Sequence, residues 1–160
     1  MTESRIEARI RELGYELPVA PAPVAAYVPA VTSGSYVYTS GQLPFVDGAL
    51  PETGKVSDSG AEGSVTPENA KKYAGISLLN ALAAVKSVIG DLDRVQRVVK
   101  VVGFVASEVN FTAQPAVING ASELLGEIFG EAGQHARSAV GVPVLPLDSP
   151  VEVEIIVEYV

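Results

Sequence analysis

The sequence predicts an α+β domain in which a mixed sheet is covered on one face by two long helices. Three observations predict it: two helix-length segments with apolar residues at helical spacing, five runs rich in β-branched residues, and their order along the chain, ββαβαββ. Strands separated by single helices need right-handed crossovers, which place both helices on the same face. We therefore expect the other face to be bare and to be buried against further copies of the chain, in a closed ring.

The first 26 residues are predicted to be an appendage to a single domain that spans residues 1–160. Residues 3–13 carry apolar side chains at helical spacing, with Thr2 or Ser4 as the N-cap and Gly14 as the stop signal. Residues 15–30 hold four prolines, which deny a helix and favour an extended arm. The appendage is therefore expected to be a short extra helix followed by a proline-rich arm on the body of the domain.

The next segment predicts a hairpin and then a long loop. Residues 28–32 and 35–40 have the composition of two strands joined by a tight turn. The second strand runs into Ser40 and Gly41, where a glycine beside a hydroxyl allows backbone N–H groups to face outward and hold a small anion or carbonyl. Residues 45–66 are rich in Gly, Ser, Asp and Pro without a clear period, which predicts a loop with at most a short hairpin around residues 52–54.

Two helices and an interior strand are predicted for the middle of the chain. Thr66 as N-cap, Pro67 in the first turn and Gly90 after the last turn predict the longest helix, which ends near residue 89. Residues 95–106 are apolar on both faces around their centre, as in an interior strand. A second helix is predicted over residues 115–129 and is ended by a glycine.

The last stretch, residues 135–160, predicts two strands and carries the charges that are hardest to assign to solubility. Arg137 lies among small and apolar residues of the first strand and needs a partner. Glu152, Glu154 and Glu158 alternate with valines in the second strand, so the three carboxylates should point the same way. If the two strands pair antiparallel, Arg137 and one glutamate fall in one region of the sheet, where both could serve a single small ligand. The alternative is a surface or ion-paired arginine beside a solvated sheet face.

The composition argues against several classes of function. There is no cysteine and only one histidine, so we expect neither disulfides nor a metal site. Eleven basic and nineteen acidic side chains give a net charge of −8, and Lys71-Lys72 is the only adjacent basic pair, which disfavours nucleic acid as a partner. The N-terminus has charges where a signal peptide needs an apolar run, and no run reaches the ~20 apolar residues of a membrane span. We therefore expect a soluble, cytoplasmic protein without membrane contact.

Several short strings in a fixed order resemble one family. They are Thr39-Ser40-Gly41-Gln42-Leu43-Pro44, Ile118-Asn119, Ala136-Arg137-Ser138-Ala139-Val140, Leu145-Pro146 and Val151-Glu152-Val153-Glu154. Together with the order ββαβαββ they resemble the Rid family, the reactive-intermediate imine/enamine deaminases, also called the L-PSP endoribonuclease family. The resemblance covers residues 27–157.

This resemblance implies a fold, an assembly and a site. The implied fold is chorismate-mutase-like, of the bacillus type, assembled as a homotrimer with sites in the clefts between subunits. The family's signature arginine, which binds the substrate carboxylate, matches Arg137, and the acid that positions water matches Glu152. The other substrate-binding positions match Tyr27, Ser40, Gly41, Asn119 and Ala139, the last of which stands where the family usually has cysteine.

The activity that the resemblance implies is hydrolysis of small 2-imino or enamine acids to 2-keto acids and ammonia. This enzyme reaction needs no cofactor, because protonated imines are already electrophilic. Two rivals remain: a non-catalytic binder of small carboxylates or keto acids, in which Glu152 is idle, and RNA cleavage, which the negative charge disfavours.

Departures from the family pattern indicate a divergent subgroup. His135 stands for the usual proline and Ala26 for a glycine, while the loop over residues 45–66 is longer than typical and the N-terminal helix is extra. We expect His135 to be a loop residue near a subunit boundary rather than a catalytic group.

Overall fold

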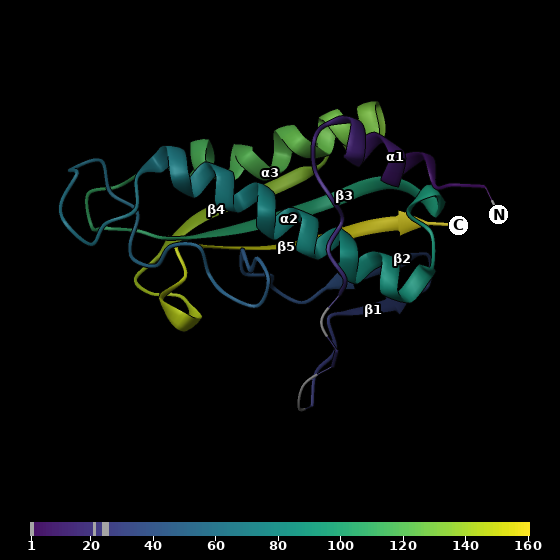
Figure 1. Cartoon of the computed structure of the whole chain (residues 1–160), viewed down its shortest axis with the longest axis horizontal. Helices are drawn as coiled ribbons and strands as arrows, with labels where there is room; N and C mark the ends of the chain where they lie inside the picture. The colour runs from purple at the N-terminus through teal and green to yellow at the C-terminus, as the bar shows by residue number, and fades with distance from the viewer. Residues whose placement is uncertain (1, 21, 24–25) are drawn as a thin grey trace.

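The computed structural model describes residues 2–20, 22–23 and 26–160 and contains the predicted order of strands and helices (Figure 1). The elements are α1 (Arg5–Glu12), β1 (Ala30–Ser33), β2 (Tyr36–Thr39), α2 (Pro67–Ile89), β3 (Val95–Ala106), α3 (Gln114–Phe129), β4 (Ala136–Val142) and β5 (Val151–Tyr159). Short 3-10 turns at Leu92–Arg94, Gly130–Gly133 and Pro146–Asp148 join some of them. None of the described helices has both the length and the apolar character that crossing a membrane requires.

The five strands form one mixed sheet in the order β1-β2-β5-β3-β4. β3 pairs with β4 in parallel, and the other neighbours are antiparallel. The antiparallel pairing considered for the two C-terminal strands does not occur, because β3 lies between β4 and β5. The long apolar β3 accepts a strand along each of its edges, and the eight residues that join β4 to β5, three of them prolines, cross its end instead of forming a tight hairpin.

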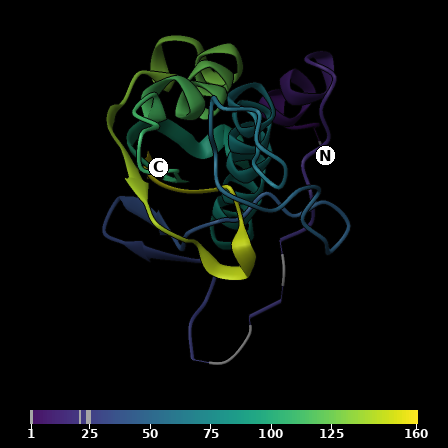
Figure 2. The ribbon, with the colours of Figure 1, turned by 90° about the vertical axis from the view of Figure 1, so that its left-hand side faces the viewer.

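The two long helices lie together on one side of the sheet, as predicted (Figure 2). α2 begins and ends at the expected signals, since the Thr66 hydroxyl accepts a hydrogen bond from the Asn69 backbone and Gly90 caps the end at a φ of 86°. α3 packs closely against α2, because a Cβ at Gly120 would collide with the Lys71 carbonyl. The apolar faces of both helices bury β3 and β5 and form the core.

The opposite face of the sheet carries no described helix and exposes large apolar side chains. One row across three strands consists of Val31, Tyr38 and Ile156, of which Val31 is 50% and Tyr38 42% exposed. The glutamates of β5 lie on this face too, because they alternate with buried valines, so the prediction that they share a face is confirmed. We call this surface the bare face.

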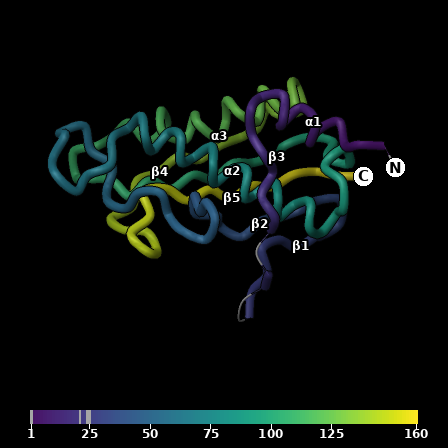
Figure 3. The backbone as a smooth tube through the Cα atoms, in the orientation of Figure 1, coloured from purple at the N-terminus to yellow at the C-terminus, as the bar shows by residue number. Residues whose placement is uncertain are grey.

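The N-terminal helix is held by one carboxylate. Asp93 accepts hydrogen bonds from the Ser4 hydroxyl at 2.9 Å and from the backbone N–H groups of Arg5 and Ile6 at 3.0 and 2.9 Å. Ser4 is the N-cap, one of the two residues predicted for that role, and Ile10 is fully buried against the core. The described part of the following arm has no helix and runs past α2 toward β1 (Figure 3), while residues 21, 24 and 25 of the predicted arm lie outside the described residues.

The segment over residues 45–66 is a loop, as predicted, without the short hairpin around residues 52–54. Gly54 instead donates its backbone N–H to the Asp148 carbonyl at 2.9 Å. Glu52 accepts a hydrogen bond from the Tyr73 hydroxyl at 2.8 Å, which ties the loop to α2. Burial, followed by this contact with Glu52, raises the pKa of Tyr73 to about 12.

Asp93→Ala should release α1 and lower the free energy of unfolding by about 1 kcal/mol at neutral pH, because the start of the helix loses its acceptor. The hydrogen bonds from Arg5, Ile6 and Ser4 outweigh the desolvation of Asp93 and lower its pKa. This contribution is therefore present above the ordinary aspartate pKa of ~3.9 and is lost as the pH falls through the lower pKa of the folded state.

Urea denaturation at several pH values and hydrogen exchange of residues 5–13 measure both effects. Asp58→Ala is the matched control, because Asp58 is exposed and its side chain has no hydrogen bond to a described residue. If Asp93→Ala unfolds at the same urea concentration as the wild type and its α1 amides exchange no faster, this account of α1 is wrong.

Candidate functional site

The arginine predicted to bind a carboxylate lies on β4 and faces α3. Arg137 is the register partner of Val101, which is buried under the helices. Its Nη1 donates to Asn119 Oδ1 at 2.7 Å and to Ser122 Oγ at 3.2 Å. Ala139 lies two residues further along the same face of the strand. The structure therefore brings together three of the predicted site residues and adds Ser122.

The two side chains that accept hydrogen bonds from this half-buried arginine are neutral. In the described part of the chain, no carboxylate oxygen lies within 4 Å of the Arg137 guanidinium. The ion-paired alternative for Arg137 is therefore not observed in this chain. A guanidinium with unsatisfied positive charge and free N–H groups is suited to a planar anion such as a carboxylate.

A second group of predicted residues lines a cavity of about 460 Å³, which we call the glutamate pocket. Tyr27, Gly41 and Glu152 contribute to its wall. The remaining lining residues are mostly apolar: Ala22, Pro23, Pro29, Gln42, Leu43, Phe45, Pro146 and Leu147. Tyr27 is 63% exposed, so it forms an open side of the pocket rather than a packed anchor.

Backbone contacts hold Gly41 against the carboxylate of Glu152. Gln42 and Val153 exchange two hydrogen bonds, with N···O distances of 2.8 and 3.0 Å, which dock the segment after β2 onto β5. A Cβ at Gly41 would collide with the Glu152 carboxylate, so the close approach requires glycine. Ser40 stands next to this contact and donates its hydroxyl to the Val28 carbonyl at 2.6 Å, fixing the segment that carries Tyr27.

The carboxyl group of Glu152 also has a shifted pKa. Burial, and secondarily the neighbouring charge of Glu154, raises the pKa of Glu152. The shift brings the carboxylate closer to the range in which it can accept and return a proton at neutral pH.

The arginine and the glutamate lie on opposite faces of the sheet. Glu152 is opposite Phe104 on β3, whereas Arg137 is beside Val101 on the same strand. Positions three residues apart on a strand point to opposite faces, so Glu152 lies on the side of the bare face. One chain therefore does not bring both charges to one ligand, as it could have done if the two C-terminal strands paired with each other.

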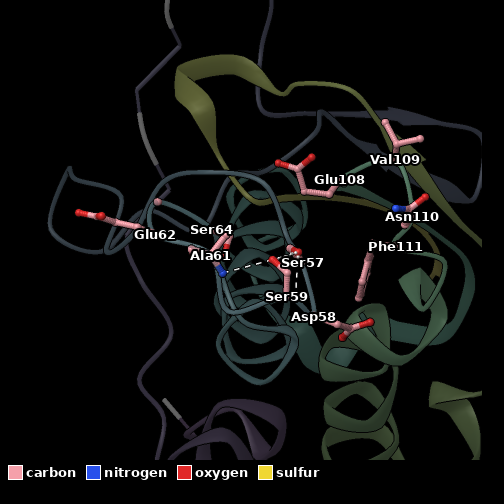
Figure 4. A pocket seen from close by; sticks show the side chains of 11 residues that line it. Ser57, Asp58, Ser59, Ala61, Glu62, Ser64, Glu108, Val109, Asn110 and Phe111 are labelled. Atoms are coloured by element: carbon pink, nitrogen blue, oxygen red, sulfur yellow. Dashed lines mark hydrogen bonds between the residues drawn. The ribbon is translucent and has the colours of Figure 1, made fainter.

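Another cavity, of about 700 Å³, contains none of the predicted site residues. It lies between the loop over residues 57–64 and the turn over residues 108–111 (Figure 4). The carboxylates of Asp58, Glu62 and Glu108 point in different directions around it. No group of three His, Cys, Asp or Glu side chains in the described ranges is arranged to hold a metal ion.

Sequence reasoning missed Ser122 and predicted His135 only as a loop residue, which is confirmed, without its contact to Ser122. Ser122 lies one helical turn after Asn119 on α3, a spacing that could have indicated it. His135 Nε2 lies 2.8 Å from Ser122 Oγ, which no pattern in the sequence indicates.

The comparisons with known proteins agree with this fold. The sequence profile of the family described as "YjgF/chorismate_mutase-like, putative endoribonuclease" matches residues 7–159. Protein TCP17 of Trypanosoma cruzi is 43% identical over 159 residues, which cover 99% of this chain and 96% of that protein. The "Putative reactive intermediate deaminase TdcF" of Escherichia coli strain K12 is 32% identical over 142 residues, covering 86% of this chain and 89% of TdcF.

Solved structures are similar over the same extent. The crystal structure of Atu1372, a protein with unknown function from Agrobacterium tumefaciens, has a TM-score of 0.87 and 44% identity, covering 97% of this chain and 93% of that one. Escherichia coli TdcF with bound serine has a TM-score of 0.61 and 27% identity, covering 88% and 94%. The chain belongs to the YjgF/Rid family, as its motifs predicted, and has the chorismate-mutase-like fold.

Gly41→Ala should displace the Glu152 carboxylate toward solvent with little change in melting temperature, because the added Cβ meets the flexible end of a side chain. The pKa of Glu152 should then fall toward the ordinary glutamate range, since burial is the main cause of its rise. Carboxyl carbon NMR titration measures it. Gly126→Ala is the control, because a Cβ there meets nothing within 4 Å. An unchanged Glu152 pKa in Gly41→Ala would contradict this reading of the contact.

Proposed function

We propose that the protein hydrolyses small 2-imino acids and their enamine tautomers to 2-keto acids and ammonia. The observation that carries the proposal is the half-buried Arg137, which donates hydrogen bonds to the neutral side chains of Asn119 and Ser122. Its planar guanidinium can clamp a substrate carboxylate with two hydrogen bonds. The description of the relative TdcF as a reactive intermediate deaminase supports this reaction, and the serine bound to TdcF supports a ligand of amino-acid size.

Besides a clamp for the carboxylate, the reaction needs a water molecule aimed at the imine carbon, and in this proposal Glu152 orients and deprotonates that water. The carboxylate takes a proton from water as the oxygen attacks C2 of the protonated imine, and the C=N bond becomes a single bond, giving a neutral carbinolamine. Glu152 then returns that proton to the nitrogen. The C–N bond breaks and ammonia leaves with the bonding pair, while the C=O bond forms and the hydroxyl proton passes back to the Glu152 carboxylate. The raised pKa of Glu152 suits a group that must both accept and return a proton.

The complete site needs two copies of the chain, because Arg137 and Glu152 lie on opposite faces of one sheet. We infer that one copy supplies Glu152 with Tyr27, Ser40 and Gly41. Its neighbour supplies Arg137 with Asn119 and Ala139. The bare face, with exposed Val31 and Tyr38, offers the apolar area that association would bury, and a homotrimer closes the ring.

Two other functions are weaker. A non-catalytic binder of small carboxylates would use Arg137 in the same way and leave Glu152 idle. RNA cleavage, which the family description contains, gains no support from a net charge of −8 and a single histidine. Kinetics separate the first alternative from the enzyme.

Glu152→Gln should lower kcat by ~10²–10⁴ and leave KM nearly unchanged, because the amide keeps the shape of the side chain but cannot accept the proton. Arg137→Lys is the contrasting variant: it keeps the charge, loses the planar fork and should chiefly raise KM. Imino acids made in place by an amino-acid oxidase serve as substrates, and semicarbazide trapping measures their lifetime. Wild-type rates in Glu152→Gln would leave Glu152 without a role. A wild-type chain that binds keto acids but accelerates no imine hydrolysis would support the binder.

A further inference from the structure

The single histidine of the chain begins a line of hydrogen bonds that ends at the arginine. His135 immediately precedes β4, and its Nδ1 lies 2.6 Å from the Gly133 carbonyl oxygen. Its Nε2 lies 2.8 Å from Ser122 Oγ. We propose that His135, acting through Ser122, is a positioning residue that orients Arg137 for the ligand carboxylate, an inference that rests on the proposed function.

The partners of the imidazole ring set the direction of each hydrogen bond. A carbonyl oxygen can only accept, so the network assigns the ring hydrogen to Nδ1, which donates to Gly133. In the neutral ring Nε2 is then an acceptor, and the Ser122 hydroxyl donates its one hydrogen to it. The lone pairs of Ser122 Oγ are thereby directed toward a donor, which is Arg137 Nη1 at 3.2 Å.

The same nitrogen of Arg137 has its second acceptor one helical turn away. Asn119 Oδ1 lies 2.7 Å from Nη1, so two side chains on one face of α3 occupy both hydrogens of that nitrogen. Nη2 and Nε donate to no described residue. The edge of the guanidinium that carries these two nitrogens therefore stays available for a bidentate carboxylate.

The Gly133 carbonyl, at which this line begins, belongs to a closely packed turn. Gly133 is buried at the end of the turn Gly130–Gly133, and a Cβ there would collide with the Leu125 carbonyl, so the turn packs directly on α3. Without His135, the Ser122 hydroxyl would be free to donate to a carbonyl of its own helix, as serines in helices do. Arg137 would then lose a fixed acceptor, and ordering the guanidinium would cost part of the binding free energy.

The arrangement also resembles a serine nucleophile beside a histidine base. Ser122 Oγ, however, accepts from Arg137, which directs its lone pairs toward the guanidinium. The positioning role therefore predicts that a fluorophosphonate reagent does not label Ser122. Labelling of Ser122 would overturn the proposal in favour of a nucleophile.

The test compares three variants by the Kd of pyruvate, measured by calorimetry, and by KM for imino acids. Ser122→Ala and His135→Asn should each raise both by about 3–10-fold, the equivalent of one hydrogen bond, with little change in kcat. His135→Gln should stay within about 2-fold of the wild type, because a glutamine amide oxygen can reach the place of Nε2 and an asparagine oxygen cannot. Equal losses in the Gln and Asn variants, or none in either, would overturn the proposal.

A double variant separates positioning from a general structural role. If His135 acts only through Ser122, His135→Asn should have no further effect on Kd in the Ser122→Ala background. Additive losses would show a separate role for the ring and overturn the relay. Pyruvate binding without turnover would defeat only the proposed function, whereas a wild-type chain that does not bind pyruvate at millimolar concentration would defeat both. Melting curves of all variants confirm that they fold.

Discussion

The position of β3 between β4 and β5 is the constraint on which the rest of the site depends. It places Arg137 beside Val101, under the helices, and Glu152 beside Phe104, on the other face of the sheet. One chain therefore carries the two charges on separate faces, and the proposed site depends on a second copy to bring them to one ligand.

The two halves of the proposed site, around Arg137 and around Glu152, depend on different interactions. A partly buried cation is costly when its N–H groups lack acceptors, and α3 supplies them as neutral oxygens from Asn119 and Ser122, which orient the guanidinium without cancelling its charge. Glu152 is prepared by burial and by the glycine at position 41, which allows the backbone to close over the carboxylate. The arginine is therefore suited to binding, and the glutamate to proton transfer.

Local signals predicted most of the fold, and non-local pairing explains what they missed. Helix caps depend on a few neighbouring residues, and so does the alternation of buried and exposed side chains in a strand. The sequence therefore predicted the caps at Thr66 and Gly90 and the alternation in β5, and the structure confirms them. The pairing partners of β4 and β5 could not be predicted in this way. Two strands separated by eight residues resemble a hairpin, and it is the two free edges of β3 that make them pair with β3 instead of with each other. The contact of His135 with Ser122 was hidden for the same reason, since it joins α3 to the residue before β4.

The most direct test of the divided site is complementation between two inactive variants. Arg137→Ala removes the arginine half and leaves the glutamate half, and Glu152→Gln does the reverse. Co-expressed in equal amounts, chains that associate at random should form intact sites, with arginine from one copy and glutamate from the next, at about a quarter of all sites. Purification through different tags on the two variants removes the unmixed complexes, and a mixed trimer has one intact site in three, so the account predicts recovery of about a third of the wild-type imine hydrolysis in the purified mixed complexes. Mixed complexes that contain both chains and yet stay inactive would contradict it.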